Sequence, residues 1–113
     1  MATFQKFNQF VEDLAKGVHN LSTGQLKVAL TNTAPVAANS VYADLTSPLA
    51  TTNLSGATPF NVTTTSAEQT SGTLSLVLAD LTLTATGAVG PFRYVVLYND
   101  TPTSPADPLI GFY

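Results

Sequence analysis

The most apolar block of the chain is Phe92-Arg-Tyr-Val-Val-Leu-Tyr98. Successive side chains of a strand point to opposite faces. One face of this block would carry Phe92, Tyr94, Val96 and Tyr98, and the other Arg93, Val95 and Leu97. A strand that is apolar on both faces is typical of the centre of a sheet, where each side is covered. We therefore predict a central strand, with a sandwich core on one side and an N-terminal helix on the other.

Alternating apolar and polar residues predict further strands on either side of this block. The alternation is clearest over 26–31, 74–79 and 81–86, and shorter candidates are 60–65 and 109–113. A bend is expected at Ala79-Asp80, since no Asn-Gly or Asp-Gly turn is present there. Residues 33–56 are rich in proline and small polar residues, so a long loop is expected there, with a short strand near 41–45.

The N-terminal segment has a helical pattern. Its apolar stripe consists of Phe4, Phe7, Val11, Leu14 and Val18. This spacing predicts one face of a helix within residues 1–20, with Thr3 as the N-cap and Gly17 ending it in the left-handed conformation. Phe10 widens the apolar arc. The helix either packs on its own sheet or docks into a groove on a partner.

These patterns predict one domain of 113 residues: a helix in 1–20 and a β-sandwich in 25–113. The expected fold class is mainly β, an antiparallel β-sandwich or jelly-roll-like module with one N-terminal α-helix. The strand predicted at 109–113 ends the chain. Either Tyr113 closes the sheet, or the natural chain continues, or this strand completes a neighbouring molecule.

Composition excludes several classes of function. Charged residues make up 10% of the chain, against about 25% in an average soluble domain. The four basic residues are scattered, which argues against nucleic-acid binding. No apolar run is long enough to span a membrane, and no secretory signal is evident. The low charge suits either an ordinary Thr-rich β-sandwich surface or one that contacts other protein.

The sequence offers little chemistry for catalysis. His19 is the single histidine, and its place at the predicted helix end favours a cap or turn residue over a general base. No serine sits in a G-x-S-x-G elbow, and no spacing singles out a pair of the seven carboxylates. Cysteine is absent, which fits a reducing compartment. We expect no enzymatic activity, with a hydrolase as the residual alternative, and no cofactor or metal.

Several segments carry a resemblance to a known family. They are ATFQKFNQFVEDLAKGVHNL (2–21), LKVALTNTAP (26–35), GPFRYVVLYND (90–100) and LIGFY (109–113). Together they resemble a family of small virion structural proteins encoded by tailed bacteriophages and prophages. The similarity covers nearly the whole chain, and the middle loop is its least distinctive part. Relatives continue past the segment matching 109–113, so the resemblance implies that the last sheet is incomplete in this sequence.

The resemblance implies a capsid decoration, or cement, protein. Such a protein would form homo-oligomers on the major capsid protein of the virion after assembly in the bacterial cytoplasm, with no nucleic-acid or membrane partner. The residues expected at its protein interfaces are Phe4, Phe7, Phe10, Tyr94, Tyr98 and Tyr113. The alternative is a tail or fibre-associated virion protein that binds glycans. Tyr42, Tyr94 or Tyr98 would then stack on sugars, unless these tyrosines pack in the core or at interfaces.

Overall fold

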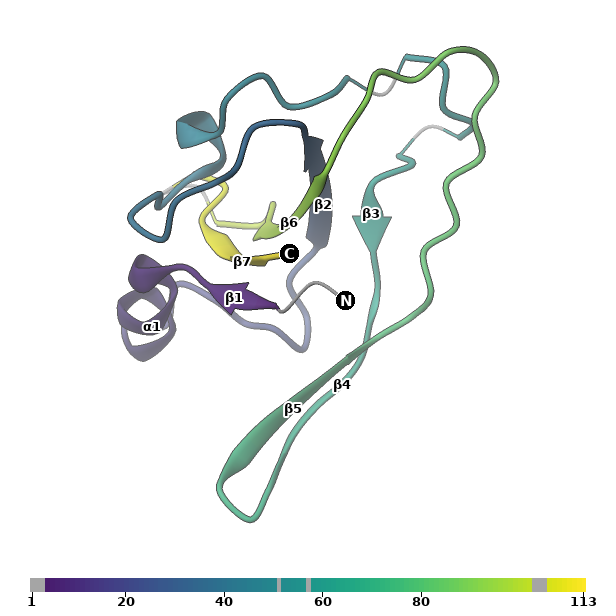
Figure 1. The fold of residues 1–113 in the computed structure, drawn as a ribbon. Coiled ribbons are helices and arrows are strands. Elements are labelled where there is room, and N and C mark those ends of the chain that lie inside the picture. The colour runs from purple at the N-terminus through teal and green to yellow at the C-terminus, as the bar shows by residue number, and fades with distance from the viewer. Residues whose placement is uncertain (1–3, 51, 57, 103–105) are drawn as a thin grey trace.

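The computed structural model describes residues 4–50, 52–56, 58–102 and 106–113, and the fold is mainly β, as predicted. In chain order the elements are β1 (Gln5–Lys6), α1 (Asn8–Ala15), β2 (Leu26–Thr31), the 3-10 helix η1 (Tyr42–Asp44), β3 (Asn61–Val62), β4 (Thr64–Thr70), β5 (Thr73–Leu78), β6 (Tyr94–Asn99) and β7 (Leu109–Phe112). Five strands form one antiparallel sheet in the order β1-β7-β6-β2-β3, and β4 and β5 form a separate hairpin (Figure 1). This arrangement is consistent with a β-sandwich.

Strand β6 lies at the centre of the five-stranded sheet, which confirms the prediction from its two apolar faces. It pairs with β2 from Leu26↔Asn99 to Thr31↔Tyr94, and with β7 on its other side. On one face, Val96 and Tyr98 belong to a cluster with Phe7. On the opposite face, Leu97 belongs to a cluster with Phe10. The N-terminal segment therefore supplies one aromatic ring to each face of the sheet.

The predicted N-terminal stripe is wrong in detail. The helix is confined to Asn8–Ala15, and Gln5–Lys6 is a strand that pairs with β7. Phe7 lies between them, fully buried, and its backbone N–H donates to the Ile110 carbonyl at 3.2 Å. Val11 is 59% exposed, so it is not part of the buried face. Pairing with the open edge of β7 satisfies backbone groups that a helix would otherwise have to cap, and it overrides the helical spacing.

The rest of the helix prediction has mixed outcomes. Leu14 is exposed, and the buried residues of α1 are Phe10 and Asp13. Gly17 follows the helix with a φ of +77°, the left-handed conformation that was predicted to end it. The expected N-cap, Thr3, lies outside the described residues. The helix described here is too short to cross a membrane.

Two further strand predictions fail. Residues 81–86 form no strand, because their partner is the loop at 53–55 instead of a sheet. Ser55 N–H donates to the Thr84 carbonyl at 2.8 Å, and Thr86 N–H donates to the Asn53 carbonyl at 2.7 Å. The short strand expected near 41–45 is the helix η1. The candidate at 60–65 corresponds to β3 and the start of β4, whereas the polar continuation of β4 to Thr70 was not predicted.

The hairpin and the chain that follows it form a projecting arm, which we define as residues 63–83. Figure 1 shows β4 and β5 extending away from the five-stranded sheet. The two strands pair with each other, and Ala79 N–H closes the hairpin base by donating to the Thr63 carbonyl at 2.8 Å. Along β5, Leu74, Leu76 and Leu78 share one face. The arm therefore presents a row of leucines that the sheet only partly covers.

Candidate functional site

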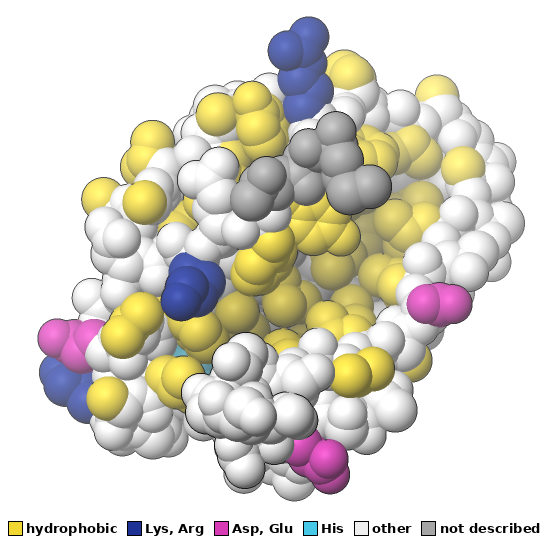
Figure 2. Space-filling model, turned by 60° about the horizontal axis from the view of Figure 1, so that its bottom comes forward, with side chains coloured by type: hydrophobic (Ala, Val, Ile, Leu, Met, Phe, Trp, Pro, Cys, Tyr) yellow, Lys and Arg dark blue, Asp and Glu magenta, His cyan; other side chains and the backbone are white. Residues whose placement is uncertain are grey.

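A hollow of about 610 Å³ lies between the five-stranded sheet and the arm (Figure 2). Its sheet wall consists of Val28, Leu30, Val62, Val95 and Leu97, its arm wall of Leu76, Leu78, Ala79, Asp80, Leu81 and Leu83, and its rim of Phe4, Phe92 and Tyr113. Among the described residues of this lining, Asp80 is the single charged one. In the space-filling view the concave surface is almost continuously hydrophobic.

The alternation of side chains along β5 and β6 forms both walls of this hollow. In β5 it directs Leu76 and Leu78 toward the sheet, and in β6 it directs Val95 and Leu97 toward the arm. Sequence alone did not identify this site, because a leucine row along a strand looks the same whether it faces a core or an open hollow. The missing signal is the position of the arm, which stands away from the sheet.

The size and chemistry of the hollow indicate a binding surface. An engineered apolar cavity of about 150 Å³ already binds benzene, so this hollow of about 610 Å³ has room for several aliphatic side chains. Leaving such a surface in water costs about 25 cal/mol per Å² of apolar area. Contiguous exposed apolar patches on soluble proteins mark sites of protein or ligand contact. A partner would be recognised here by its apolar shape and by the charge of Asp80.

Aromatic residues mark the rim of the hollow. Phe4 is 47% exposed and Tyr113 is 50% exposed, and their ring centroids lie 5.9 Å apart. Phe4 rests against Gly111, where a Cβ atom would collide with its ring. Phe92, which is also exposed, completes this edge and was not among the predicted interface residues.

The six predicted interface residues do not form one surface. Phe4 and Tyr113 lie on the rim of the hollow, and Tyr94 is half-buried on β6. Phe7, Phe10 and Tyr98 lie in the core of the molecule. Phe7 and Phe10 pack inside the molecule and are not available to a partner in this fold, whereas Tyr98 also lines a second hollow on the other face of the sheet.

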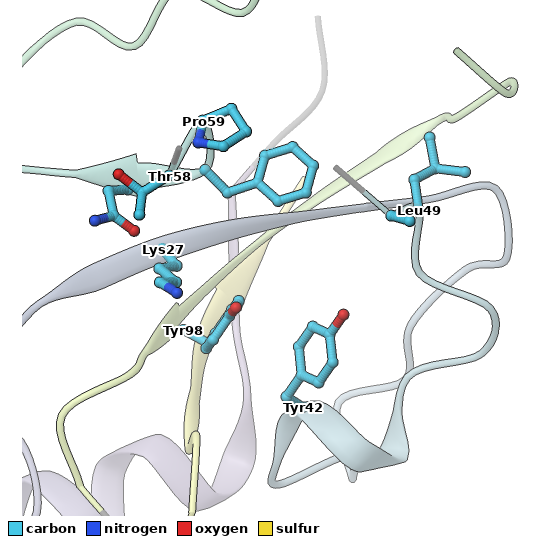
Figure 3. A pocket seen from close by; sticks show the side chains of 9 residues that line it. Lys27, Tyr42, Leu49, Thr58, Pro59 and Tyr98 are labelled. Atoms are coloured by element: carbon cyan, nitrogen blue, oxygen red, sulfur yellow. The ribbon is translucent and has the colours of Figure 1, made fainter. Parts of the chain in front are cut away.

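A second hollow, of about 430 Å³, lies on the other face of the sheet (Figure 3). Lys27, Tyr42 and Tyr98 line it, together with residues of the loops near 49 and 59. The rings of Tyr42 and Tyr98 pack at 4.9 Å, tilted by 46°. Burial is the main cause that raises the pKa of both hydroxyls, so each stays neutral at ordinary pH. Lys27 pairs with Asp100 at 3.4 Å.

His19 is a buried structural residue. Asn99 Oδ1 accepts from the Thr101 backbone N–H at 3.1 Å, so the Asn99 amide nitrogen is the group that donates to His19 Nδ1 at 3.2 Å. Phe10 packs on the imidazole, with ring centroids 5.2 Å apart. Burial lowers the pKa of His19, and the nearby Asp13 carboxylate opposes this shift. Neither His19 nor Asp13 lines either hollow.

Because His19 is buried, we expect the free energy of unfolding to decrease on acidification. Because its pKa in the folded state is below the ordinary 6.5, the unfolded chain takes up a proton that the folded chain resists. The contribution of neutral His19 to the free energy of unfolding should be complete above pH 6.5. Below that pH the free energy of unfolding should decrease, by at most about 1.4 kcal/mol per pH unit. Urea titrations from about pH 7.5 to about pH 5.5 would measure this.

His19→Gln is the matched variant, because glutamine offers an oxygen to the Asn99 amide but does not titrate. Both proteins contain the same carboxylates, so the difference between the two curves reports on the histidine. An identical pH dependence in His19→Gln would contradict the assignment.

The remaining ionisable groups do not gather into a site. Among the described residues, no three His, Asp or Glu side chains come together as a metal ligand set would require. Burial and the neighbouring Asp100 raise the pKa of Asp107, and Lys27 acts in the opposite direction. Asp44 caps its own loop by accepting from the backbone N–H of Ser40 at 2.9 Å. The apolar hollow is therefore the most developed candidate site in the described part of the chain.

Comparisons with known proteins add no template for this site. Scans against family models, curated proteins and solved structures each found no match for the chain.

Proposed function

We propose that this chain is a structural protein of a tailed-phage virion that decorates the capsid. In this role it would stabilise the head by bridging subunits of the major capsid protein, with no catalytic step of its own. The observation that supports this role most is the apolar hollow of about 610 Å³, in which Asp80 is the single charged residue of the described lining. A cement protein acts through the area that it buries against its partners. The hollow offers such an apolar area, which is exposed to solvent in the free chain.

Two further features support the proposal. The sequence resemblance to tailed-phage virion proteins runs through the N-terminal segment, β2, β6 and β7. Low charge also suits a protein that is buried among copies, because charged side chains lose hydration at an interface. A symmetric shell multiplies weak contacts, since each copy engages several subunits at once.

Copy number in purified particles tests the proposal. Quantitative mass spectrometry of virions from a phage encoding this chain should find on the order of hundreds of copies, in a fixed ratio to the major capsid protein. About a dozen copies or fewer would assign the chain to the tail instead. Virions that lack the chain altogether would refute both placements.

The second hollow favours an alternative function, that of a tail or fibre-associated protein that binds glycans. Tyr42 and Tyr98, two of the tyrosines considered for stacking on sugars, lie together in this hollow beside Lys27. Aromatic faces and polar groups are what a sugar-binding site requires. Tyr94, the third tyrosine considered, does not line this hollow.

The glycan alternative predicts a clear result for Tyr42→Ala. The half-buried ring of Tyr42 forms one wall of the hollow, so its loss should weaken binding to a glycan array at least about tenfold. Tyr113→Ala, on the opposite side of the sheet, is the control and should bind normally. An absence of glycan binding by the wild-type chain would remove this alternative.

A further inference from the structure

We propose that strand β5 pairs through its free edge with β5 of a second copy of this chain. The two strands would run antiparallel about a twofold axis, so that two β4-β5 hairpins form one four-stranded sheet in the order β4-β5-β5-β4. This inference goes beyond the proposed virion role, because it concerns the purified chain and requires no capsid.

Four strands lie at the edges of the two described sheets, and three of them are poor templates for another chain. Strands β1 and β3 have two residues each, and Lys6 adds a charge to β1. Strand β4 carries Glu68 and a register irregularity between Thr64 and Ser66. Short length, charge and bulges are the features by which natural sheets protect an edge from pairing.

Strand β5 has none of these protections. Its six residues, Thr73–Leu78, contain no charged side chain and no proline, and its pairing with β4 is regular from Thr73 to Val77. Leu74 is 48% exposed and Val77 is 45% exposed. An apolar edge of this length that stays free is a template for pairing with another strand.

The turn of the hairpin determines which backbone groups of β5 are free. Ser71 and Gly72 form the two-residue loop, and both have a positive φ, as a type I′ turn requires. The flanking pair Thr70↔Thr73 is then hydrogen-bonded across the turn. Along an antiparallel ladder, hydrogen-bonded pairs alternate with pairs whose backbone groups point outward.

This alternation directs the backbone groups of odd-numbered β5 residues toward β4 and those of even-numbered residues away from it. The bond from Ala79 N–H to the Thr63 carbonyl, at 2.8 Å, continues the same pattern. The N–H and C=O groups of Leu74, Leu76 and Leu78 therefore point away from β4. Outside the hairpin ladder, no backbone hydrogen bond of the described chain uses these three residues. Strand β5 thus presents a row of free donors and acceptors at even spacing.

One register uses the free groups of all three leucines. A twofold axis at Leu76 pairs this residue with its own copy, and it pairs Leu74 with Leu78 of the second copy. Each pair then exchanges two backbone hydrogen bonds, and the leucine side chains of the two copies lie next to one another on one face of the sheet. Leu76 and Leu78 already pack within their own chain, whereas exposed Leu74 gains an apolar neighbour.

Charge and symmetry both favour a second copy as the occupant of this edge. The charged side chains of residues 61–90 are Glu68 and Asp80, and neither belongs to β5. Two β5 edges therefore meet without like charges directly opposite each other, which would destabilise the pairing. The same surface is used on both molecules, so the assembly closes at two copies and leaves the charged strand β4 at each outer edge.

Amide hydrogen exchange tests the proposal on the unmodified chain. Raising the protein concentration from about 10 µM to about 1 mM should slow exchange at the amides of Leu74, Leu76 and Leu78 at least about tenfold, because dimerisation engages them. The matched controls are the amides of Ala67 and Gln69, which point outward from the other strand of the hairpin and should exchange at an unchanged rate. Exchange at the three leucines that is independent of concentration would overturn the proposal.

Disulfide trapping tests the register, because the chain contains no cysteine. In the proposed dimer Ser75 lies opposite Val77 of the second copy in a non-hydrogen-bonded pair, with Cα atoms about 4.5 Å apart, which a disulfide can span. Ser75→Cys mixed with Val77→Cys should give a mixed disulfide in at least about tenfold higher yield than Gln69→Cys mixed with Val77→Cys. All three positions are exposed, so access does not separate the mixtures. Equal yields would contradict this register.

Leu74→Pro should block the edge while keeping the hairpin. It removes an N–H that points away from β4, where an edge strand tolerates proline, and the dimer dissociation constant measured by sedimentation should rise at least about tenfold. Gln69→Pro is the matched control, because Gln69 lies opposite Leu74 across the hairpin. This control also loses the bond from Gly72 N–H to Gln69 Oε1 at 3.0 Å, so it perturbs the hairpin more and should still leave the constant unchanged. An equal rise in both variants would count against the β5 edge.

Two outcomes separate this pairing from the virion role. Leucine amides that stay unprotected at about 1 mM, in a chain present at on the order of hundreds of copies per particle, would overturn the pairing and leave the virion role standing. Protection that appears only after the major capsid protein is added would assign the β5 edge to the capsid and would likewise overturn it.

Discussion

Phe7→Ala is expected to destabilise the fold by about 3–5 kcal/mol, the range for losing a buried phenylalanine. The Phe7 ring is fully buried, and its centroid lies 4.9 Å from that of Phe112. It anchors the N-terminal segment on the face of the sheet that carries Val96 and Leu109. Small domains have roughly 5–15 kcal/mol of stability in total, so this loss would remove a large share of it.

The control for this variant is Phe4→Ala. Phe4 is 47% exposed, so its truncation should cost no more than about 1 kcal/mol. Urea unfolding followed by circular dichroism measures both variants. Similar losses for the two would mean that Phe4 and Phe7 share one helix face, as their spacing alone predicts, and would contradict the strand at Gln5–Lys6.

Leu83→Asp is expected to abolish assembly while the chain remains folded. Leu83 lines the arm wall of the hollow and lies outside the named strands, so its replacement removes no ladder pair. A carboxylate there would have to be desolvated by any apolar occupant, at a cost of several kcal/mol. Incorporation into particles should fall at least about a hundredfold.

Thr82→Asp is the matched control, because Thr82 is exposed, adjacent in sequence and absent from the lining of the hollow. It adds the same charge one residue away, on a side chain that does not line the hollow. Competition with wild-type protein during particle assembly would compare the two variants. Normal incorporation of Leu83→Asp, or an equal defect in Thr82→Asp, would argue against the hollow as the contact surface.

The central part of the fold could be predicted because local pattern and tertiary environment agree there. In β6, apolar residues on both faces require cover on both faces, and the cluster with Phe7 covers one face while the cluster with Phe10 covers the other. Strand β2 and the Leu74–Leu78 part of β5 follow the same alternation. The left-handed Gly17 was likewise fixed by local chemistry, since glycine adopts that conformation without steric cost.

The ends of the chain and the arm could not be predicted because long-range pairing decides them. Phe4 and Phe7 have helical spacing, but the free edge of β7 draws the residues between them into a strand. Strand β4 is polar along most of its length and exists because β5 pairs with it. Leu81 and Leu83 alternate as in a strand, although the chain there runs along a hollow without a sheet partner.

The candidate site was missed for the same reason. Exposed aromatic residues were expected to mark the interface, and only Phe4 and Tyr113 of the six reach the hollow. The larger share of the surface comes from aliphatic residues in β2, β5 and β6, which resemble ordinary core residues in sequence. Whether such residues form a closed core or an open wall depends on how far apart two elements stand, and periodicity carries no information on that distance.

A reconstruction of virus particles by electron cryomicroscopy tests the contact role most directly. The proposal predicts density for this chain repeated over the outer surface of the head, with polypeptide filling the hollow between the sheet and the arm. A head whose surface lacks this chain, or copies whose hollow faces solvent and is empty, would contradict it.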